Sequence, residues 1–234
     1  MKMSSHAVRA QRVEPRTSLD DFPTPCWGTR SLVEEVLAQT DIGVPEGRVF
    51  EPTANRGYMS RPLKEYWPDV TTSDIFDYRP DPETIDPQDH VGDFLAAGET
   101  VATTAEIIIS NPPFKAAQAF ITRALALPDW RLVAMLTRSS FVEGETRYHG
   151  LFADSPPQFI CQFVQRLPII KSRVRKWKRK PTSTTPRGMR QSTATSYSWL
   201  VWWRGAPTDW GDPRFRFIPP CRDRLERPGD YPDE

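Results

Sequence analysis

The stretch at residues 106–110, followed directly by Asn111-Pro112-Pro113-Phe114, constrains this chain most. Its three successive isoleucines, Ile107 to Ile109, predict a strand buried on both faces, which is typical of a parallel sheet with helices on either side. Two prolines then keep the backbone extended while a carboxamide and an aromatic ring project beyond the sheet edge. Such a bend can hold a flat group that carries an amine. A proline turn capped by asparagine is the alternative for an isolated tetrapeptide.

Segments of strand and helix character alternate along much of the chain. Strands are predicted at residues 48–51, 70–73, 106–110 and 131–137, and helices at residues 27–37, 60–67 and 116–127. Residues 79–92, rich in proline and acid, are expected to form a loop, with a short element beginning at Asp93. Two later β-prone runs, 159–164 and 197–203, are expected to pair as an antiparallel hairpin at the sheet edge. The alternation predicts an α/β fold whose sheet is mostly parallel.

Composition and cysteine spacing bound the domain organisation. The 234 residues are 38% hydrophobic and 26% charged, which fits one globular domain with a sizeable core. We expect a disordered N-terminal arm at residues 1–18, one domain at 19–206 and an irregular C-terminal tail at 207–234. The three cysteines lie far apart, so neither a disulfide framework nor a zinc site is indicated. Because no apolar segment is long enough for a membrane span or a signal peptide, we expect a cytoplasmic protein.

Charge is distributed very unevenly along the chain. Between Asp154 and Asp209 there are eleven lysines and arginines and no acidic residue. Such asymmetry is typical of contact with a polyanion, and a solvated loop without a partner is the alternative. We predict that residues 166–196 form an insertion that orders on DNA. Its expected contacts are Lys171, Arg173, Arg175, Lys176, Lys178, Arg179, Lys180, Arg187 and Arg190.

Residues that directly follow the predicted strands are candidates for a ligand site, because open parallel sheets bind ligands at the carboxyl ends of their strands. They are Glu51 to Gly57, Asp74, Asp93 with Phe94, and Asn111 to Phe114. Gly57 would let a ligand approach the backbone, yet the turn lacks the GxGxxG spacing of a pyrophosphate site, which disfavours NAD and FAD. The Asp74 carboxylate suits two vicinal ribose hydroxyls, and a turn residue or helix N-cap is the alternative.

Together these motifs resemble the class I S-adenosylmethionine-dependent methyltransferases, in particular the adenine-N6 DNA methyltransferases of phage and bacterial type. The resemblance covers most of residues 20–203. The family's first-strand turn, E-P-x-A-G-x-G, matches residues 51–57, its proline-rich element matches Phe22-Pro23-Thr24-Pro25, and its tetrapeptide, (N/D/S)-P-P-(Y/F), matches residues 111–114. It implies a Rossmann-like sheet with S-adenosylmethionine as cofactor. The implied cofactor contacts are Thr24, Pro25, Glu51, Thr53, Ala54, Asn55, Gly57, Asp74, Asp93, Phe94 and Asn111.

The resemblance also implies how the tetrapeptide works. The Asn111 carboxamide oxygen and the Pro112 carbonyl would accept the two N–H bonds of an exocyclic adenine amine, so that its lone pair faces the methyl donor. Phe114 would stack on the base, which must leave the duplex because its amine is inaccessible inside the helix. The expected catalytic residues are therefore Asn111, Pro112, Pro113 and Phe114. The expected partner is duplex DNA with a flipped adenine, bound with low sequence specificity, and no metal is required.

Two other functions stay open. A sister group with the same fold and an Asn-Pro-Pro tetrapeptide methylates the glutamine amide of release factors or the exocyclic amine of guanine in ribosomal RNA. The basic segment favours nucleic acid over protein. Asn55 stands where the family's first glycine is common, so a nucleic-acid-binding homologue that has lost catalysis is the second alternative. The resemblance places the protein in the cytoplasm of a bacterium or a phage-infected host cell.

Overall fold

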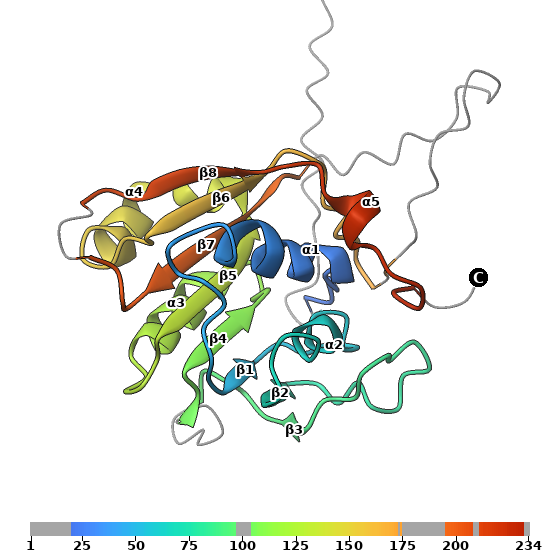
Figure 1. Cartoon of the computed structure of the whole chain (residues 1–234). Helices are drawn as coiled ribbons and strands as arrows, with labels where there is room; N and C mark the ends of the chain where they lie inside the picture. Colours follow the sequence, from blue (N-terminus) through green and yellow to red (C-terminus); the bar gives the residue numbers. More distant parts are fainter. Residues whose placement is uncertain (1–19, 97–103, 173, 175–194, 208–210, 232–234) are drawn as a thin grey trace, which may run out of the picture.

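The computed structural model describes residues 20–96, 104–172, 174, 195–207 and 211–231 (Figure 1). The strands are β1 (Val49–Glu51), β2 (Val70–Asp74), β3 (His90–Val91), β4 (Ile107–Ser110), β5 (Leu132–Arg138), β6 (Phe159–Phe163), β7 (Tyr197–Trp203) and β8 (Arg214–Ile218). The helices are α1 (Cys26–Ser31) with a π-helical continuation (Leu32–Leu37), α2 (Ser60–Leu63), α3 (Ala117–Leu125), a 3₁₀ turn (Ser139–Val142), α4 (Glu145–Arg147) with a π-helical continuation (Tyr148–Phe152), and α5 (Arg222–Leu225). The expected N-terminal arm and most of the expected basic insertion lie outside the described residues.

The eight strands form one sheet in the order β3-β2-β1-β4-β5-β7-β6-β8. β1 pairs in parallel with β2 on one side and with β4 on the other, so the chain order reverses between β1 and β4. β7 runs antiparallel to both of its neighbours, β5 and β6. The prediction of a mostly parallel, Rossmann-like α/β sheet is therefore confirmed. The reversal beside β1 marks the place where sheets of this kind bind ligands.

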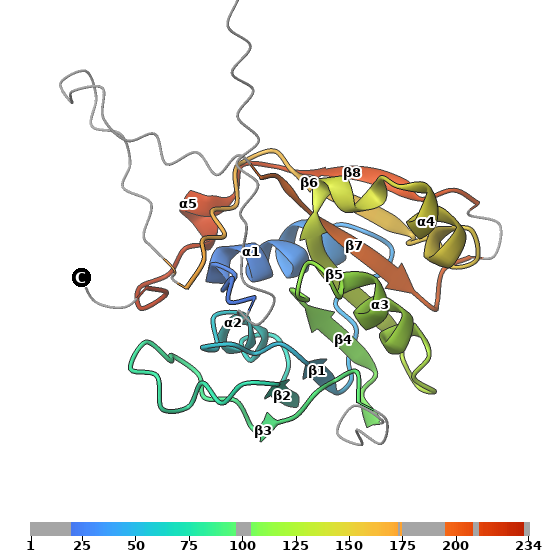
Figure 2. The same cartoon turned by 180° about the vertical axis from the view of Figure 1, so that it is seen from behind.

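Helices cover both faces of the sheet (Figures 1 and 2). Ile107 and Ile109 of β4 pack into a core cluster with α1, its π-helical continuation and α2. Ile108 points to the other face and joins a second cluster, which contains Phe120 and Ile121 of α3. Burial of all three isoleucines confirms that β4 is covered on both sides, as the unbroken apolar run predicts.

The end of the chain differs from the expected irregular tail. Residues 214–218 form β8, which pairs in parallel with β6, and α5 follows. The pair β6–β7 is antiparallel, as expected, but it does not lie at the sheet edge, because β7 lies between β5 and β6 and β8 pairs with β6 on its other side. The expected loop at residues 79–92 contains one further strand, β3, which extends the opposite edge beside β2. In both places a short strand is stabilised by a neighbour that is distant in sequence.

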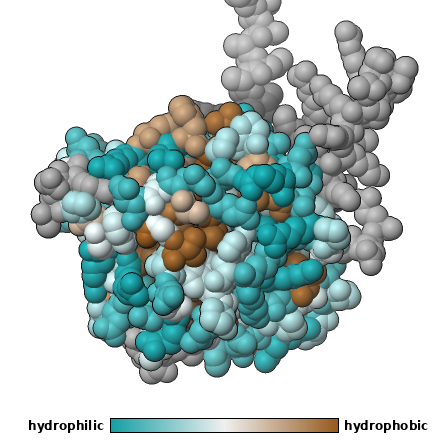
Figure 3. Space-filling model, viewed as in Figure 1, coloured by the Kyte–Doolittle hydropathy of each residue, from teal (hydrophilic) through white to brown (hydrophobic). Residues whose placement is uncertain are grey.

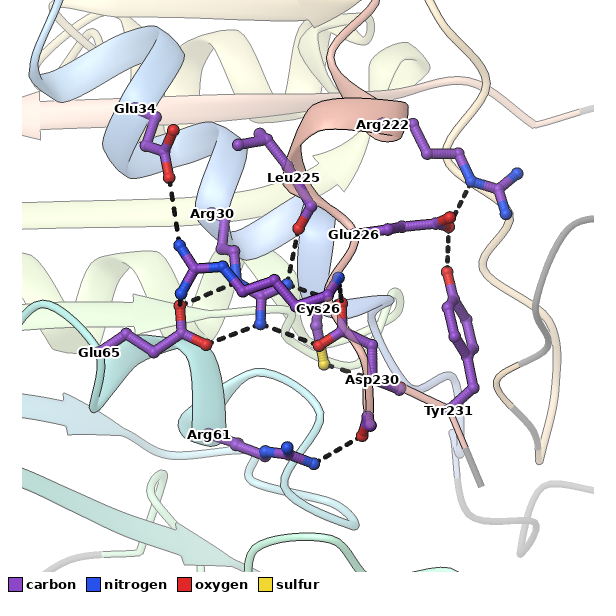
Figure 4. A network of polar contacts seen from close by, with 12 residues as sticks. Cys26, Arg30, Glu34, Arg61, Glu65, Arg222, Leu225, Glu226, Asp230 and Tyr231 are labelled. Atoms are coloured by element: carbon purple, nitrogen blue, oxygen red, sulfur yellow. Dashed lines mark hydrogen bonds and ion pairs between the residues drawn. The ribbon is translucent and has the colours of Figure 1, made fainter. Parts of the chain in front are cut away.

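A buried guanidinium ties the C-terminal segment to α1 and α2 (Figure 4). Arg30 donates to both carboxylate oxygens of Asp230 at 2.7 and 2.9 Å and to both of Glu65 at 2.7 and 2.9 Å. A fifth bond, 2.7 Å long, goes to the backbone carbonyl of Leu225 at the end of α5. These five bonds use every N–H of a guanidinium that is only 1% exposed. The segment after β8 is therefore an integral part of the fold.

The face seen in Figure 3 is mostly hydrophilic, with hydrophobic side chains at its centre and along the rim over β8. On β8, Phe215 and Phe217 are 57% and 67% exposed. The three cysteines, Cys26, Cys161 and Cys221, are free and buried. Among the described residues, no helix has the length and apolar character needed to cross a bilayer.

Candidate active site

A cavity of about 290 Å³ lies at the carboxyl ends of β1 to β4, beside the reversal of strand order. It gathers most of the residues predicted for the site, although they come from segments far apart in the sequence. Those that line it are Thr24, Glu51, Thr53, Ala54, Asn55, Asp74, Asp93, Phe94, Asn111 and Pro113. Other wall residues were not predicted, among them Asp20, Tyr58, Met59, Ile75, Tyr78, Leu95, Ala116 and Phe120. These are mainly apolar side chains that no motif marks, so only the folded chain brings them together.

Four predicted residues lie outside the cavity lining: Pro25, Gly57, Pro112 and Phe114. Gly57 has a left-handed φ of 85°, and a Cβ there would come within 2.3 Å of the backbone oxygen of Asp86. The close passage of the Asp86 backbone therefore requires a glycine here, and the expected approach of a ligand to this backbone stays a prediction. Pro25 instead precedes α1 as its N-cap, and Pro112 is buried.

The turn after β1 is held by side chains from three segments. Asn55 has a left-handed φ of 51°, a conformation that asparagine adopts more readily than most residues. Its backbone N–H donates to Asp74 Oδ2 at 3.0 Å, and its carboxamide donates to Asp21 Oδ1 at 2.8 Å. Arg56 completes the link through ion pairs with Asp21 at 2.9 Å and Asp81 at 2.7 Å. The Asn55 carboxamide nitrogen is thus engaged in the frame of the turn, although Asn55 also lines the cavity.

The Asp74 carboxylate at the end of β2 organises two turns. Besides the bond from Asn55, it accepts the backbone N–H of Phe76 at 3.0 Å. Burial raises the pKa of Asp74 to about 6, because the charged form loses hydration that these N–H bonds only partly replace. Asp74 therefore acts as a turn residue, which was one of the alternatives from the sequence. The same side chain also lines the cavity, so its contact with a ribose stays a prediction in addition to the turn role.

Three polar atoms on the cavity wall are buried and lack a hydrogen-bond partner within the described part of the chain. They are Thr24 Oγ1, Glu51 Oε2 and Asn111 Oδ1. Burial, together with the nearby carboxylates of Asp86 and Asp74, raises the pKa of Glu51 well above its ordinary value. Unsatisfied buried polar groups are costly and uncommon in folded proteins. Three of them around one cavity indicate a site prepared for a polar ligand.

The bend after β4 is fixed by the N-terminal segment that crosses it. Asn111 Nδ2 donates to the backbone oxygen of Phe22 at 2.9 Å, and the backbone N–H of Phe114 donates to Asp20 Oδ2 at 2.6 Å. Thr53 Oγ1 lies 2.8 Å from Ser110 Oγ and donates to the backbone oxygen of Asn111 at 3.3 Å. The Asn111 amide nitrogen is thus committed to the fold, and its carbonyl oxygen is left for another donor.

Phe114 is half-buried and packs mainly against aromatic neighbours. Its ring centroid lies 5.1 Å from that of Phe22 and 6.2 Å from that of Tyr197. The guanidinium carbon of Arg138 lies over the ring, 4.0 Å from its centroid. The aromatic side chain that was expected to stack on a base therefore stands beside the cavity with an arginine over it.

Of the predicted basic insertion, the structure describes residues 166–172, 174, 195 and 196. Lys171 is half-buried next to Ser172, whose backbone N–H donates to the Asp21 carbonyl at 2.8 Å. The other predicted nucleic-acid contacts, Arg173 and those at residues 175–190, lie outside the described residues. Ser172 is bonded to the segment that crosses the tetrapeptide, so the basic insertion begins close to the candidate site.

No family model of known proteins matches this sequence, and no curated protein matches it. The fold is similar to a dimethyladenosine transferase from Plasmodium falciparum, with 16% identity and a TM-score of 0.37, over 55% of this chain and 46% of that chain. It is also similar to magnesium protoporphyrin IX methyltransferase from Synechocystis with bound SAM, with 16% identity and a TM-score of 0.41, over 75% and 77% of the two chains. The Mtq2-Trm112 complex of E. cuniculi, which methylates eRF1, has 10% identity and a TM-score of 0.45, over 79% and 99%. At such scores these likenesses carry no conclusion about function, which has to come from the site.

Proposed function

We propose that this chain is an S-adenosylmethionine-dependent methyltransferase that acts on the exocyclic N6 amine of adenine in DNA. The observation that carries the proposal is the Asn111 carbonyl oxygen, which is buried on the wall of the strand-end cavity without a partner among the described residues. A rigid acceptor of this kind suits an amine N–H of a substrate. It has no evident structural use, because the Asn111 amide nitrogen already anchors the residue to Phe22.

The charge of the cavity supports this cofactor. Four acidic residues line it, Asp20, Glu51, Asp74 and Asp93, while no lysine or arginine does so in the part of the chain that the structure describes. Such a lining favours a cationic ligand and disfavours the phosphates of a dinucleotide. When bound, S-adenosylmethionine supplies a methyl carbon made electrophilic by its sulfonium. Glu51 and Thr24 each have an oxygen without a partner among the described residues, which would accept its ammonium group, and Asp74 would accept its ribose hydroxyls.

The tetrapeptide would prepare the amine for transfer. An adenine amine is a weak nucleophile because its lone pair is delocalised into the ring, and two acceptors on its N–H bonds favour a pyramidal nitrogen. Asn111 Oδ1 and the Pro112 carbonyl would be those acceptors. The nitrogen would then bond to the methyl carbon as the carbon–sulfur bond breaks, with S-adenosylhomocysteine as the leaving group, and it would release a proton to water. Orientation and fixed dipoles account for such a step without a dedicated base.

The choice of DNA rests on the sequence of the basic segment. Its cations would hold the phosphate backbone while a flipped adenine enters the site, at a cost of about a few kcal/mol for unstacking. Most of them would bind backbone and not read bases, which agrees with low sequence specificity.

The direct test is to incubate the purified protein with S-adenosylmethionine and either unmethylated DNA, unmethylated ribosomal RNA or a release factor. Digestion to nucleosides or peptides, followed by mass spectrometry, identifies the modified group. N6-methyladenine from DNA is the expected product. Methylguanine from RNA or methylglutamine from the protein would overturn the substrate, and would support instead the sister activities that the tetrapeptide also suits.

A separate binding measurement tests the enzymatic nature of the protein. We expect labelled S-adenosylmethionine to bind at the strand-end cavity and Asp74→Ala to weaken that binding. Absence of binding by the wild-type protein would favour a nucleic-acid-binding protein without catalysis.

A further inference from the structure

Arg138 is the last residue of β5, and its side chain is exposed at the carboxyl edge of the sheet. β5 pairs in parallel with β4, and Ser110, the last residue of β4, is in register with Met135, so β5 continues three residues beyond the end of β4 to Arg138. Arg138 is also the register partner of Tyr197, a buried aromatic neighbour of Phe114. This pairing brings an exposed guanidinium to the tetrapeptide from a strand that no site motif marks.

The guanidinium carbon lies 4.0 Å from the centre of the Phe114 ring, the closest cation–π pair among the described residues. The aromatic neighbours of Phe114 are different in kind. Phe22 and Tyr197 are buried at 7% and 3% exposure, and their rings are tilted from the Phe114 ring by 44° and 36°. They form its fixed surroundings, and Arg138 is an exposed side chain with several rotatable bonds.

The guanidinium fills the space over one face of the Phe114 ring, and a base stacked on that face would need the same space. Two flat groups cannot lie on one ring face at the same spacing, so one must give way. A cation–π pair at an exposed site is weak compared with the stacking of a base on an aromatic ring, which favours the exchange. Guanidinium planes also stack on nucleobases, so the displaced side chain has a new flat partner within its reach.

We propose, on the basis of the proposed function, that Arg138 is a positioning residue which covers Phe114 in the free protein and stacks on the outer face of the target base in the complex. The base would lie between Phe114 and the Arg138 guanidinium, with its amine directed to Asn111. This arrangement selects an extended heteroaromatic ring. A glutamine amide has no such ring, so Arg138 favours a nucleobase over a protein substrate.

Three substitutions separate the stacking plane from the charge. Arg138→Lys keeps the charge and removes the plane, Arg138→Gln keeps a smaller plane and removes the charge, and Arg138→Ala removes both. Arg131→Ala is the matched control. Arg131 is also exposed, and it directly precedes β5, at the end of the strand opposite to Arg138. The substrate is an oligothymidylate with one central adenine, so that the target base is known without knowledge of a recognition sequence.

We expect Arg138→Ala and Arg138→Lys to raise KM for the oligonucleotide about tenfold, as expected when a base is deprived of one stacking partner, with the affinity for S-adenosylmethionine unchanged. Arg138→Gln should fall between them and the wild type, and Arg131→Ala should match the wild type. With 2-aminopurine in place of the adenine, the wild type should quench the fluorescence of the bound base, and the Ala and Lys variants should quench it less.

Full activity and quenching in Arg138→Lys would mean that only charge matters and would overturn the proposal, as would wild-type values in Arg138→Ala. These outcomes leave the proposed function intact. A wild type that binds S-adenosylmethionine and methylates no nucleic acid would overturn the proposed function. In that case the 2-aminopurine titration still tests the stacking site. If the wild type does not quench the fluorescence of the base, the proposal that Arg138 stacks on the base is overturned.

Discussion

At the scale of single residues, the site is defined by buried polar side chains, some of whose atoms have no hydrogen-bond partner among the described residues. Asn111 uses its nitrogen to hold the bend and leaves its oxygen buried and unpaired in the described structure. Asp74 uses its carboxylate to hold two turns and keeps a raised pKa. Each side chain therefore maintains the fold and also faces the cavity. In Asn111 the carbonyl oxygen is left for a ligand, and in Asp74 the raised pKa leaves a carboxyl group that a ligand could ionise.

Replacing Asn111 tests the acceptor directly. Asn111→Ala should lower kcat by about 100-fold or more, the usual effect of removing one preorganised hydrogen bond to a reacting group. The dissociation constant for S-adenosylmethionine, measured by calorimetry, should change by no more than about twofold, because the acceptor serves the amine. Gln118→Ala removes an amide from α3 as a control and should leave kcat unchanged. Undiminished turnover in Asn111→Ala would contradict the assigned role.

The raised pKa of Asp74 predicts a pH dependence of stability for the protein without ligand. The folded protein holds this proton more tightly than the unfolded chain, so the free energy of unfolding should fall as the pH rises from 3.8 to about 6, and then level off. The fall is about 1.4 kcal/mol for each unit of pKa difference. Asp74→Asn should remove this component from urea-denaturation curves recorded across that range. A variant with the slope of the wild type would show that Asp74 titrates normally.

At the scale of elements, short strands and tight turns are positioned by distant neighbours. β3 has two residues and β8 has five, and each pairs with only one strand at an edge of the sheet. The alternation Arg214-Phe215-Arg216-Phe217 is itself a strand pattern, which the proline- and acid-rich composition around it obscured. The turn after β1 likewise depends on the loop at Asp86, which fills the space beside Gly57.

Alanine substitutions at two glycines with left-handed φ separate the cost of backbone strain from the cost of a steric clash. Gly57→Ala meets both a φ of 85° and the Asp86 backbone, whereas Gly43→Ala meets a φ of 65° with nothing within 4 Å. We expect Gly43→Ala to lower the free energy of unfolding by about 1 kcal/mol, and Gly57→Ala to lower it by at least about 2 kcal/mol. Urea denaturation measures both. Equal losses would mean that the 86 loop moves aside freely.

At the scale of the whole molecule, segments that are distant in sequence meet around α1. The Arg30 guanidinium joins α1 to Glu65, near the end of α2, and to Asp230 close to the C-terminus. The segment before α1 crosses the tetrapeptide, and α1 follows it directly. The C-terminal segment therefore supports the helix next to the candidate site, and none of its described residues, 211–231, lines the cavity.

Removing one partner of the buried pair should destabilise the protein strongly. Asp230→Ala leaves the Arg30 charge without one of its two carboxylates in a site that is 1% exposed, and should lower the free energy of unfolding by about 3–5 kcal/mol. Asp212→Ala, at an exposed position before β8, is the control and should change it by less than about 0.5 kcal/mol. A comparably small effect in Asp230→Ala would show that the C-terminal segment is dispensable for folding.

The basic segment predicts a salt-dependent association with DNA. Neutralising Lys176, Lys178, Arg179 and Lys180 together should flatten the plot of log affinity against log salt concentration by about 0.9 for each phosphate that the variant no longer neutralises. Neutralising Arg48, Arg131 and Arg204, which lie beside the opposite ends of the strands, should leave the slope unchanged. A slope retained in the first variant would place the polyanion surface elsewhere.

The sequence by itself determined the class of fold and the edge of the sheet at which a ligand would bind. The isoleucine run specifies a strand buried on both faces, and residues that follow parallel strands necessarily meet at one edge. Both inferences depend on patterns within short segments, which can be read without knowing the tertiary structure. For this reason most of the predicted contacts line one cavity, although Thr24 and Pro113 are 89 residues apart in the sequence.

Only the tertiary structure decided which atoms of those residues are free and which are already used. The commitment of Gly57 to Asp86, the frame around Asn55 and the cover of Arg138 over Phe114 are all contacts between distant segments. A residue's type gives its capacity to bind, but whether that capacity is already used depends on neighbours brought close by folding. The strands β3 and β8 follow the same rule, since short segments form strands only where a partner edge is presented to them.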